Sequence, residues 1–379
     1  MRFSVAQTKP VLSADVRRRV APRIGLPRAL LAYRYFPLWH RFLTGVGCTV
    51  VTSPPTNKDI LAAGIRLSVD DVCIPVKAFI GHLLYLKARG VDAIMAPRVF
   101  AIEDPPKRRF TCPKFMGLPD LARAILGGSP PLLDADLDVA ARPVADTFVE
   151  IGRMLGRKKK ASLAAYRVAS DAQARFDDRR AAGWGFNKAV AHALGTIDGI
   201  GEARGSSGDA ASTRDADLLV ATIGHPYLLS DRFLSFSLEE RLGRLGARLI
   251  DPLSIPPATV EAELTKYWEL SWSYEREILG AVSHLMARTD VDGIVFLTSF
   301  ACGTFPVTSE IIEREVRRGT NKPVLYLMVD ELTGEAGVQT RLESFCDLLR
   351  ARHDRAGDGD RPAQARAATA EDPAGDVRP

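Results

Sequence analysis

The feature that most constrains the fold is a regular alternation of short apolar runs with longer helical patterns. In the first half, runs rich in β-branched residues end at Gly, Pro or a polar turn and cover residues 23–27, 48–52 and 91–97. The same pattern returns in the second half at residues 217–223, 247–250, 293–297 and 323–329. Because strands that alternate with helices form parallel sheets, we expect an α/β protein with two Rossmann-like parallel-sheet lobes.

The length of the chain and the material between the strand runs divide it further. At 379 residues, the chain is longer than one ordinary hydrophobic core supports. A stretch with a helical period and no strand signal separates the two halves, a Gly- and Ser-rich stretch follows it, and the last residues have no apolar period. We expect an N-terminal extension (residues 1–22), a first α/β lobe (23–130) and a helical insert (131–200). A linker (201–215), a second α/β lobe (216–352) and a disordered tail (353–379) follow.

Charge and hydropathy exclude several classes of protein. The 51 Lys and Arg residues are set against 46 Asp and Glu, and the basic run at residues 157–160 lacks interleaved aromatic residues, so we expect no nucleic-acid partner. No stretch offers the roughly eighteen apolar residues of a membrane span, and no apolar signal-peptide core follows the basic N-terminus. We therefore expect a soluble, cytoplasmic protein with no membrane partner. Neither a P-loop nor a G-x-G-x-x-G pattern follows a strand, which predicts that this chain binds no nucleotide.

Five cysteines, an odd number without close pairs, do not form a disulfide framework and fit a reducing compartment. Cys73, Cys112 and Cys302 fall in loops at predicted helix starts or strand ends, where a thiolate is stabilised. Cys48 and Cys346 fall on apolar faces, so we expect them to be structural. The spacing of the first three is too wide for a metal-binding knuckle. The residues alone therefore leave open whether these three share a metal site or are unrelated buried thiols.

Two other residues are candidates for catalysis. His225 follows the first strand of the second lobe in Gly-His-Pro-Tyr, where it could face the cleft between the lobes. Glu335, together with Glu331, flanks the turn before the last helix, which is either a helix cap or a binding loop. His82 lies one helical turn from Phe79, so we expect it to pack or cap rather than bind a metal.

Five motifs occur in order along the chain: Ile24-Gly25-Leu26-Pro27-Arg28, Val72-Cys73-Ile74-Pro75-Val76-Lys77, Gly224-His225-Pro226-Tyr227, Phe300-Ala301-Cys302-Gly303 and Asp330-Glu331-Leu332-Thr333-Gly334-Glu335. They resemble the acyl-CoA dehydratase activase-related domain of the 2-hydroxyacyl-CoA dehydratase and double-cubane iron-sulfur protein superfamily. The resemblance covers nearly all of residues 23–350.

The resemblance implies a 4Fe-4S or double-cubane cluster held by Cys73, Cys112 and Cys302 at the lobe interface. It also implies an ATP-dependent activase as donor of low-potential electrons, an acyl-CoA or another small molecule as substrate, and a homodimer or a heterodimer with a paralogous subunit. The expected activity of this oxygen-sensitive protein is radical dehydration of an acyl-CoA or reduction of a small molecule. Two alternatives remain open: a non-catalytic module that docks the activase or relays electrons, and a zinc-structural protein that uses the three cysteines and a histidine.

Overall fold

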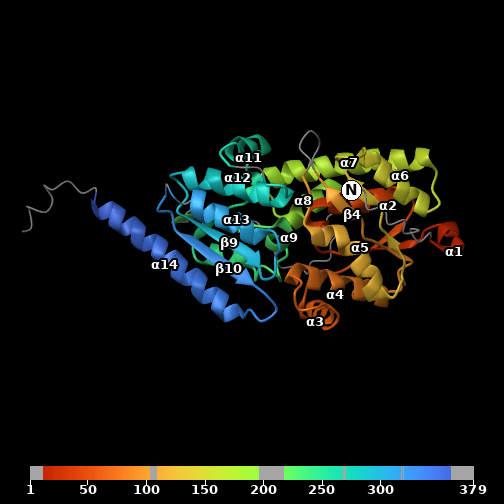
Figure 1. The fold of residues 1–379 in the computed structure, drawn as a ribbon, viewed down its shortest axis with the longest axis horizontal. Helices are drawn as coiled ribbons and strands as arrows, with labels where there is room; N and C mark the ends of the chain where they lie inside the picture. Colours follow the sequence, from red (N-terminus) through yellow and green to blue (C-terminus); the bar gives the residue numbers. More distant parts are fainter. Residues whose placement is uncertain are drawn as a thin grey trace, which may run out of the picture.

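The computed structural model describes residues 12–102, 109–195, 217–267, 270–316, 318 and 320–359. Two lobes lie side by side along the long axis of the molecule, the first coloured red to yellow and the second green to blue (Figure 1). Each lobe is built on one four-stranded sheet in which every pair of neighbouring strands is parallel. The predicted α/β fold with two parallel-sheet lobes is therefore confirmed.

The first sheet has the strand order β2-β1-β3-β5. β1 (Arg23–Leu26) lies between β2 (Thr49–Thr52) and β3 (Ala93–Met95), and Ile24 pairs with residues of both neighbours. The residues of β3 and the last three of β1 are buried, as is usual for parallel strands covered by helices on both faces.

The fourth strand of this sheet corrects the predicted boundary between the first lobe and the helical insert. β5 (Leu132–Leu133) pairs with β3, and β6 (Asp136–Asp138) pairs with β4 (Arg98–Ala101) in a small separate sheet. The prediction that the helical insert begins at residue 131 was therefore wrong. Strands of two and three residues are too short to give a recognisable period in the sequence.

Helices cover the first sheet and bring two of the cysteines toward the second lobe. In chain order they are α1 (Ala14–Arg18), α2 (Ala32–Gly45), α3 (Lys58–Leu67), α4 (Ile74–Ala88) and α5 (Pro113–Leu126). α3 and α4 touch backbone to backbone, because a Cβ on Gly64 would lie 1.8 Å from the carbonyl oxygen of Lys77 and one on Gly81 would lie 1.9 Å from that of Ile60. Only glycine allows this approach.

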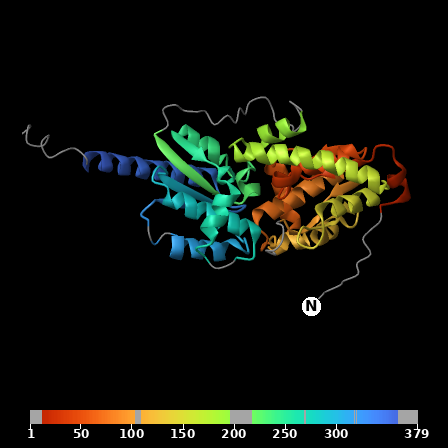
Figure 2. The ribbon, with the colours of Figure 1, turned by 90° about the horizontal axis from the view of Figure 1, so that it is seen from above.

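The expected helical segment forms α6 (Val144–Met154), α7 (Lys159–Ala181) and α8 (Phe186–Leu194). α7 packs along α2 and runs over the first lobe toward the second (Figure 2). Its Arg180 guanidinium pairs with the Asp251 carboxylate of the second lobe at 2.8 Å. This segment therefore belongs structurally to the first lobe and also contacts the second. The predicted linker at residues 201–215 lies outside the described residues.

The second sheet has the strand order β10-β9-β7-β8. Its strands are β7 (Leu218–Gly224), β8 (Ala247–Ile250), β9 (Gly293–Ser299) and β10 (Val324–Val329). The helices around it are α9 (Pro226–Leu229), α10 (Leu238–Arg244), α11 (Pro257–Leu264), α12 (Ser273–Ala287) and α13 (Phe305–Ile311), with a 3-10 turn at Pro252–Ser254 and a π-helical turn at Ile312–Val316.

The last helix, α14 (Glu335–Gly359), projects beyond the second sheet (Figure 1). α14 extends to Gly359, beyond residue 353 where the tail was predicted to begin. Residues 360–379 lie outside the described part of the chain. In the part that is described, no helix combines the length and apolar composition needed to cross a bilayer.

Candidate metal centre between the lobes

Cys73 and Cys112 occupy equivalent positions in the first lobe. Each is the N-cap residue of a long helix, Cys73 of α4 and Cys112 of α5, and each helix has proline in its first turn. The backbone N–H of Val76 donates to the Cys73 carbonyl oxygen at 2.9 Å, and that of Phe115 donates to the Cys112 carbonyl oxygen at 2.8 Å, which closes the first turn of each helix. Free N–H groups and the positive end of the helix dipole stabilise negative charge at both positions.

Cys302 comes from the second lobe, in the turn that follows β9. The preceding residue, Ala301, has a φ of 59°, in the left-handed region that residues with a Cβ rarely adopt. The backbone N–H of Phe300 donates to the carbonyl oxygen of Val329 in β10 at 2.9 Å, which fixes the start of this turn. Strain of this kind is held where the surrounding structure determines it, often at functional sites.

The three thiols are close enough to affect one another's ionisation. Burial raises the pKa of Cys112 to about 11, and the neighbouring thiols Cys302 and Cys73 add to this effect. Burial also raises the pKa of Cys73, with the Lys114 charge opposing it and Cys302 adding to it. The side chain of Tyr227 is buried, and this burial raises its pKa well above the ordinary value. Negative charge on the three thiols adds to the effect. Lys114 links the three segments in space, because its Nζ reaches the carbonyl oxygen of Ala301 beside Cys302 at 2.6 Å and that of Asp71 near Cys73 at 3.5 Å.

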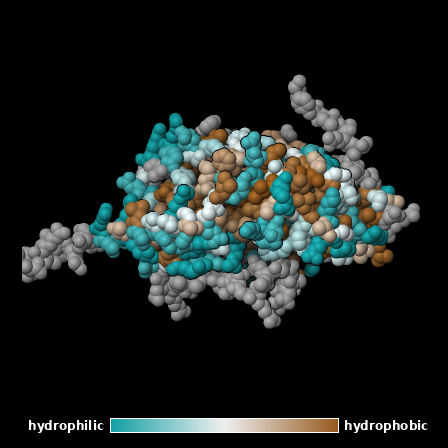
Figure 3. Space-filling model, turned by 90° about the horizontal axis from the view of Figure 1, so that it is seen from below, coloured by the Kyte–Doolittle hydropathy of each residue, from teal (hydrophilic) through white to brown (hydrophobic). Residues whose placement is uncertain are grey.

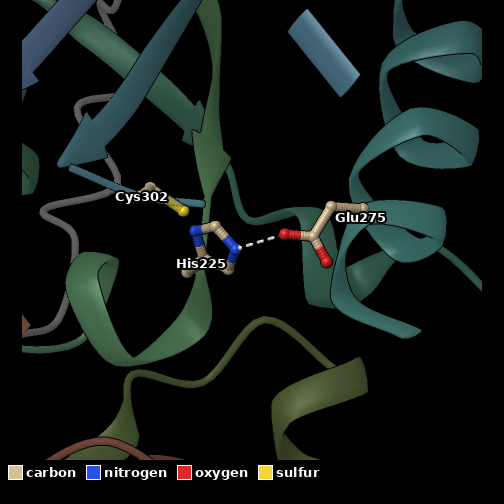
Figure 4. Close-up of side chains that lie close together, drawn as sticks. All are labelled: His225, Glu275 and Cys302. Atoms are coloured by element: carbon tan, nitrogen blue, oxygen red, sulfur yellow. Dashed lines mark hydrogen bonds and ion pairs between the residues drawn. The ribbon is translucent and has the colours of Figure 1, made fainter. Parts of the chain in front are cut away.

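His225 lies beside Cys302 and is held by Glu275. The His225 ring is at the N-cap of α9, directly after β7, and stacks on Tyr227 with ring centroids 5.0 Å apart. Its Nε2 lies 3.1 Å from Glu275 Oε1, while the other ring nitrogen faces the Cys302 sulfur (Figure 4). The candidate ligand atoms of His225, Glu275 and Cys302 all lie within 4.8 Å of one another. These three side chains thus form a compact group at the lobe interface.

Glu275 and Thr304 are members of this site that the sequence analysis missed. Glu275 lies in the first turn of α12 and accepts a hydrogen bond from the Thr304 hydroxyl at the N-cap of α13. Burial acts to raise the pKa of Glu275, but hydrogen bonds from His225 and Thr304 hold it below the ordinary value. The sequence around Glu275, Ser273-Tyr274-Glu275-Arg276, forms no known motif, so it gives no sign that Glu275 belongs to a site.

A backbone bridge between the lobes fixes the approach of the cysteine segment to α12. The N–H of Phe110, two residues before Cys112, donates to the Ser271 carbonyl oxygen at 2.8 Å, and the Ser273 N–H donates back to Phe110 at 3.0 Å. The start of α5 and the start of α12 therefore lie side by side.

Two lysines of the first lobe also reach the second. The Lys77 ammonium, on α4, pairs with the Glu331 carboxylate, and the exposed fraction of the Lys77 side chain is only 3%. Lys114, on α5, donates to the carbonyl oxygen of Ala301 at 2.6 Å. Each helix that begins at a cysteine thus carries a lysine that contacts the other lobe.

The predicted candidate Glu335 lies elsewhere. The exposed fraction of its side chain is 74%, and its carboxylate pairs with the Arg241 guanidinium at 2.8 Å. It does not contact His225 or the cysteines in the interactions described here. The group to which Glu335 belongs is a surface ion pair at the start of α14.

His82 takes part in a separate buried network at the interface. The Thr56 hydroxyl donates to the Asp231 carboxylate of the second lobe and lies 3.0 Å from His82 Nε2. The Tyr33 hydroxyl also donates to Asp231, at 3.0 Å. His82 therefore packs within a hydrogen-bonded core, as the sequence indicated, and Cys48 and Cys346 are buried away from the site among apolar residues.

Exposed apolar residues flank two of the cysteine segments. The side of the molecule that carries α3 and α4 shows hydrophobic side chains among hydrophilic ones (Figure 3). Val69, four residues before Cys73, is 68% exposed, and Phe300, two residues before Cys302, is 59% exposed.

Comparison with protein families agrees with the resemblance seen in the sequence. No curated protein matches the chain. Residues 23–255 match the family described as the CoA enzyme activase uncharacterised domain (DUF2229), a range that holds Cys73, Cys112 and His225. Because this match covers more than half of the chain, the protein belongs to the CoA enzyme activase domain family, which is consistent with an acyl-CoA dehydratase activase-related domain.

Proposed function

We propose that this chain is an iron-sulfur redox protein whose 4Fe-4S or double-cubane cluster is held by Cys73, Cys112 and Cys302. What supports the proposal is that Lys114, two residues after Cys112, reaches the backbone next to Cys302 and near Cys73, in a member of a CoA enzyme activase domain family. Thiolates are the usual ligands of such clusters, and the donors available here fit one. The two helix N-termini and the Lys114 ammonium offset the negative charge that three thiolates bring.

A cluster bound by these residues would supply one-electron transfer at low potential. In this proposal the electrons come from an ATP-dependent activase in the cytoplasm, and the substrate is an acyl-CoA or another small molecule that is dehydrated or reduced. His225 is the residue of this chain suited to hold a proton beside Cys302, because the ionised Glu275 carboxylate fixes its ring. The buried Tyr227 ring keeps His225 in place and limits the access of water.

The first experiment is the measurement of iron and acid-labile sulfide in protein purified without oxygen. We expect about four iron and four sulfide per chain for a single cube. Cys73→Ser, Cys112→Ser and Cys302→Ser should each abolish this content, whereas the matched controls Cys48→Ser and Cys346→Ser should leave it unchanged. Iron content that does not respond to the first three substitutions contradicts the proposal.

A zinc site is the second candidate, and the arrangement of His225 favours it. Histidines that bind zinc commonly donate their other ring N–H to a carboxylate, and Glu275 accepts from His225 in this way while the free ring nitrogen faces Cys302. Three cysteines and one histidine form a common structural zinc site. About one zinc per chain without sulfide, lost in His225→Ala, would establish this candidate in place of the cluster.

A further inference from the structure

We infer that Lys114 is a positioning residue that ties together the three chain segments carrying Cys73, Cys112 and Cys302. The inference deepens the proposed function and rests on it for its role in a metal centre, although the contacts themselves do not depend on any metal.

The first contact ties Lys114 to its own segment. Lys114 follows Cys112 by two residues in the first turn of α5, which the Phe115 N–H closes by donating to the Cys112 carbonyl oxygen at 2.8 Å. The position of the Lys114 side chain is therefore fixed relative to this thiol by the helix start itself.

The second contact crosses to the other lobe. The Lys114 Nζ donates to the carbonyl oxygen of Ala301 at 2.6 Å, and Ala301 directly precedes Cys302. Because Ala301 adopts a left-handed conformation, its carbonyl needs a partner that stabilises this orientation. A charged donor is stronger than a neutral one for this purpose.

The third contact reaches the remaining segment. The same Nζ lies 3.5 Å from the carbonyl oxygen of Asp71, two residues before Cys73. One ammonium group, two residues after Cys112, thus contacts the backbone next to Cys302 and the backbone two residues before Cys73.

Trivalent arsenic tests this inference without iron, because arsenite is a soft, thiophilic ion that binds tightly where two or three thiols converge. Arsenite affinity should be measured on metal-free wild type, Lys114→Met and Lys114→Arg, with Cys302→Ser as the variant that lacks one thiol. Lys87→Met is the matched control, since Lys87 also donates to a backbone carbonyl, that of Leu126 at 2.8 Å, within the first lobe.

We expect Lys114→Met to weaken arsenite binding about tenfold or more, the loss of a charged hydrogen bond, with Lys114→Arg restoring most of it and Lys87→Met leaving it unchanged. In protein with a cluster, Lys114→Met should also shift the reduction potential to a more negative value, since a positive charge beside the thiolates is removed. Equal arsenite affinity in Lys114→Met and wild type would overturn the inference. Wild type that binds arsenite tightly and loses this affinity in Lys114→Met, but holds no iron when it is purified without oxygen, would instead contradict the proposed function alone.

Discussion

The ion pair between Lys77 and Glu331 provides a sharp test of how the lobes are held together. The Lys77 side chain is 3% exposed and that of Glu331 is 26% exposed. In Glu331→Gln the buried ammonium loses its counter-charge but keeps a neutral amide partner. Removing one member of a buried pair costs about 3–5 kcal/mol. Because water partly screens Glu331, we expect a loss of about 2–3 kcal/mol in the free energy of unfolding.

Lys77→Met should cost much less, about 1 kcal/mol or less, because it removes the buried charge and leaves a carboxylate that water can reach. The double substitution should be no less stable than Lys77→Met. The control is Glu335→Gln, four residues along the chain, whose exposed pair with Arg241 should contribute within about 0.5 kcal/mol.

The assay is unfolding in urea, which does not screen charge, followed by tryptophan fluorescence. A loss below about 1 kcal/mol in Glu331→Gln, or an equal loss in Lys77→Met, would refute the reasoning that an unpaired buried ammonium dominates the cost.

Three further predictions concern packing, pH and thiol reactivity. Gly81→Ala should lower the thermal unfolding midpoint and cost about 1–3 kcal/mol or more, because the new Cβ would meet the backbone of α3. Gly117→Ala, which has open space around it, should stabilise the protein by about 0.5–1 kcal/mol. Similar midpoints for the two variants would contradict the α3–α4 contact. Burial and the Arg28 charge lower the pKa of His82 from 6.5 to about 3. As the pH falls, the unfolded chain therefore takes up a proton on this residue before the folded protein does. The free energy of unfolding should fall below pH 6.5, by about 2 kcal/mol at about pH 5. Urea unfolding at several pH values should show this slope in wild type and not in His82→Asn, and equal slopes would contradict a buried neutral histidine. After metal removal, iodoacetamide followed by mass spectrometry should label the half-buried Cys302 before the fully buried Cys346; simultaneous labelling of both would show that the lobes open globally.

The sequence predicted the architecture because its strands are long enough, or apolar enough, to be recognised. Runs such as Leu218 to Gly224 are buried on both faces and end at glycine or proline, which places both strand and turn. It failed at β5, where Leu132 and Leu133 form a strand by pairing with β3 and not by any pattern of their own. α14 also extends past residue 353, where the tail was predicted to begin, into a stretch whose two Asp and two Gly residues are poor helix formers.

The sequence suggested candidate ligands but not the residues that surround them. Cys73, Cys112 and Cys302 could be chosen because parallel sheets gather loops at one edge, and the motifs around them resemble a known family. Glu275, Thr304 and Lys114 could not be chosen, because their roles depend on which lobe surface faces which. That information lies in tertiary contacts and not in local spacing.

The division of the three thiols between the lobes has a consequence for how the protein is made. During synthesis the first lobe leaves the ribosome with Cys73 and Cys112, while Cys302 follows only after most of the second lobe. Domains generally fold as they emerge, the N-terminal one first. Any ion or cluster that needs all three thiols therefore has to be inserted late, after both lobes have docked. Delivery to a nearly finished protein, and not assembly on a nascent chain, is the order of events that this architecture imposes.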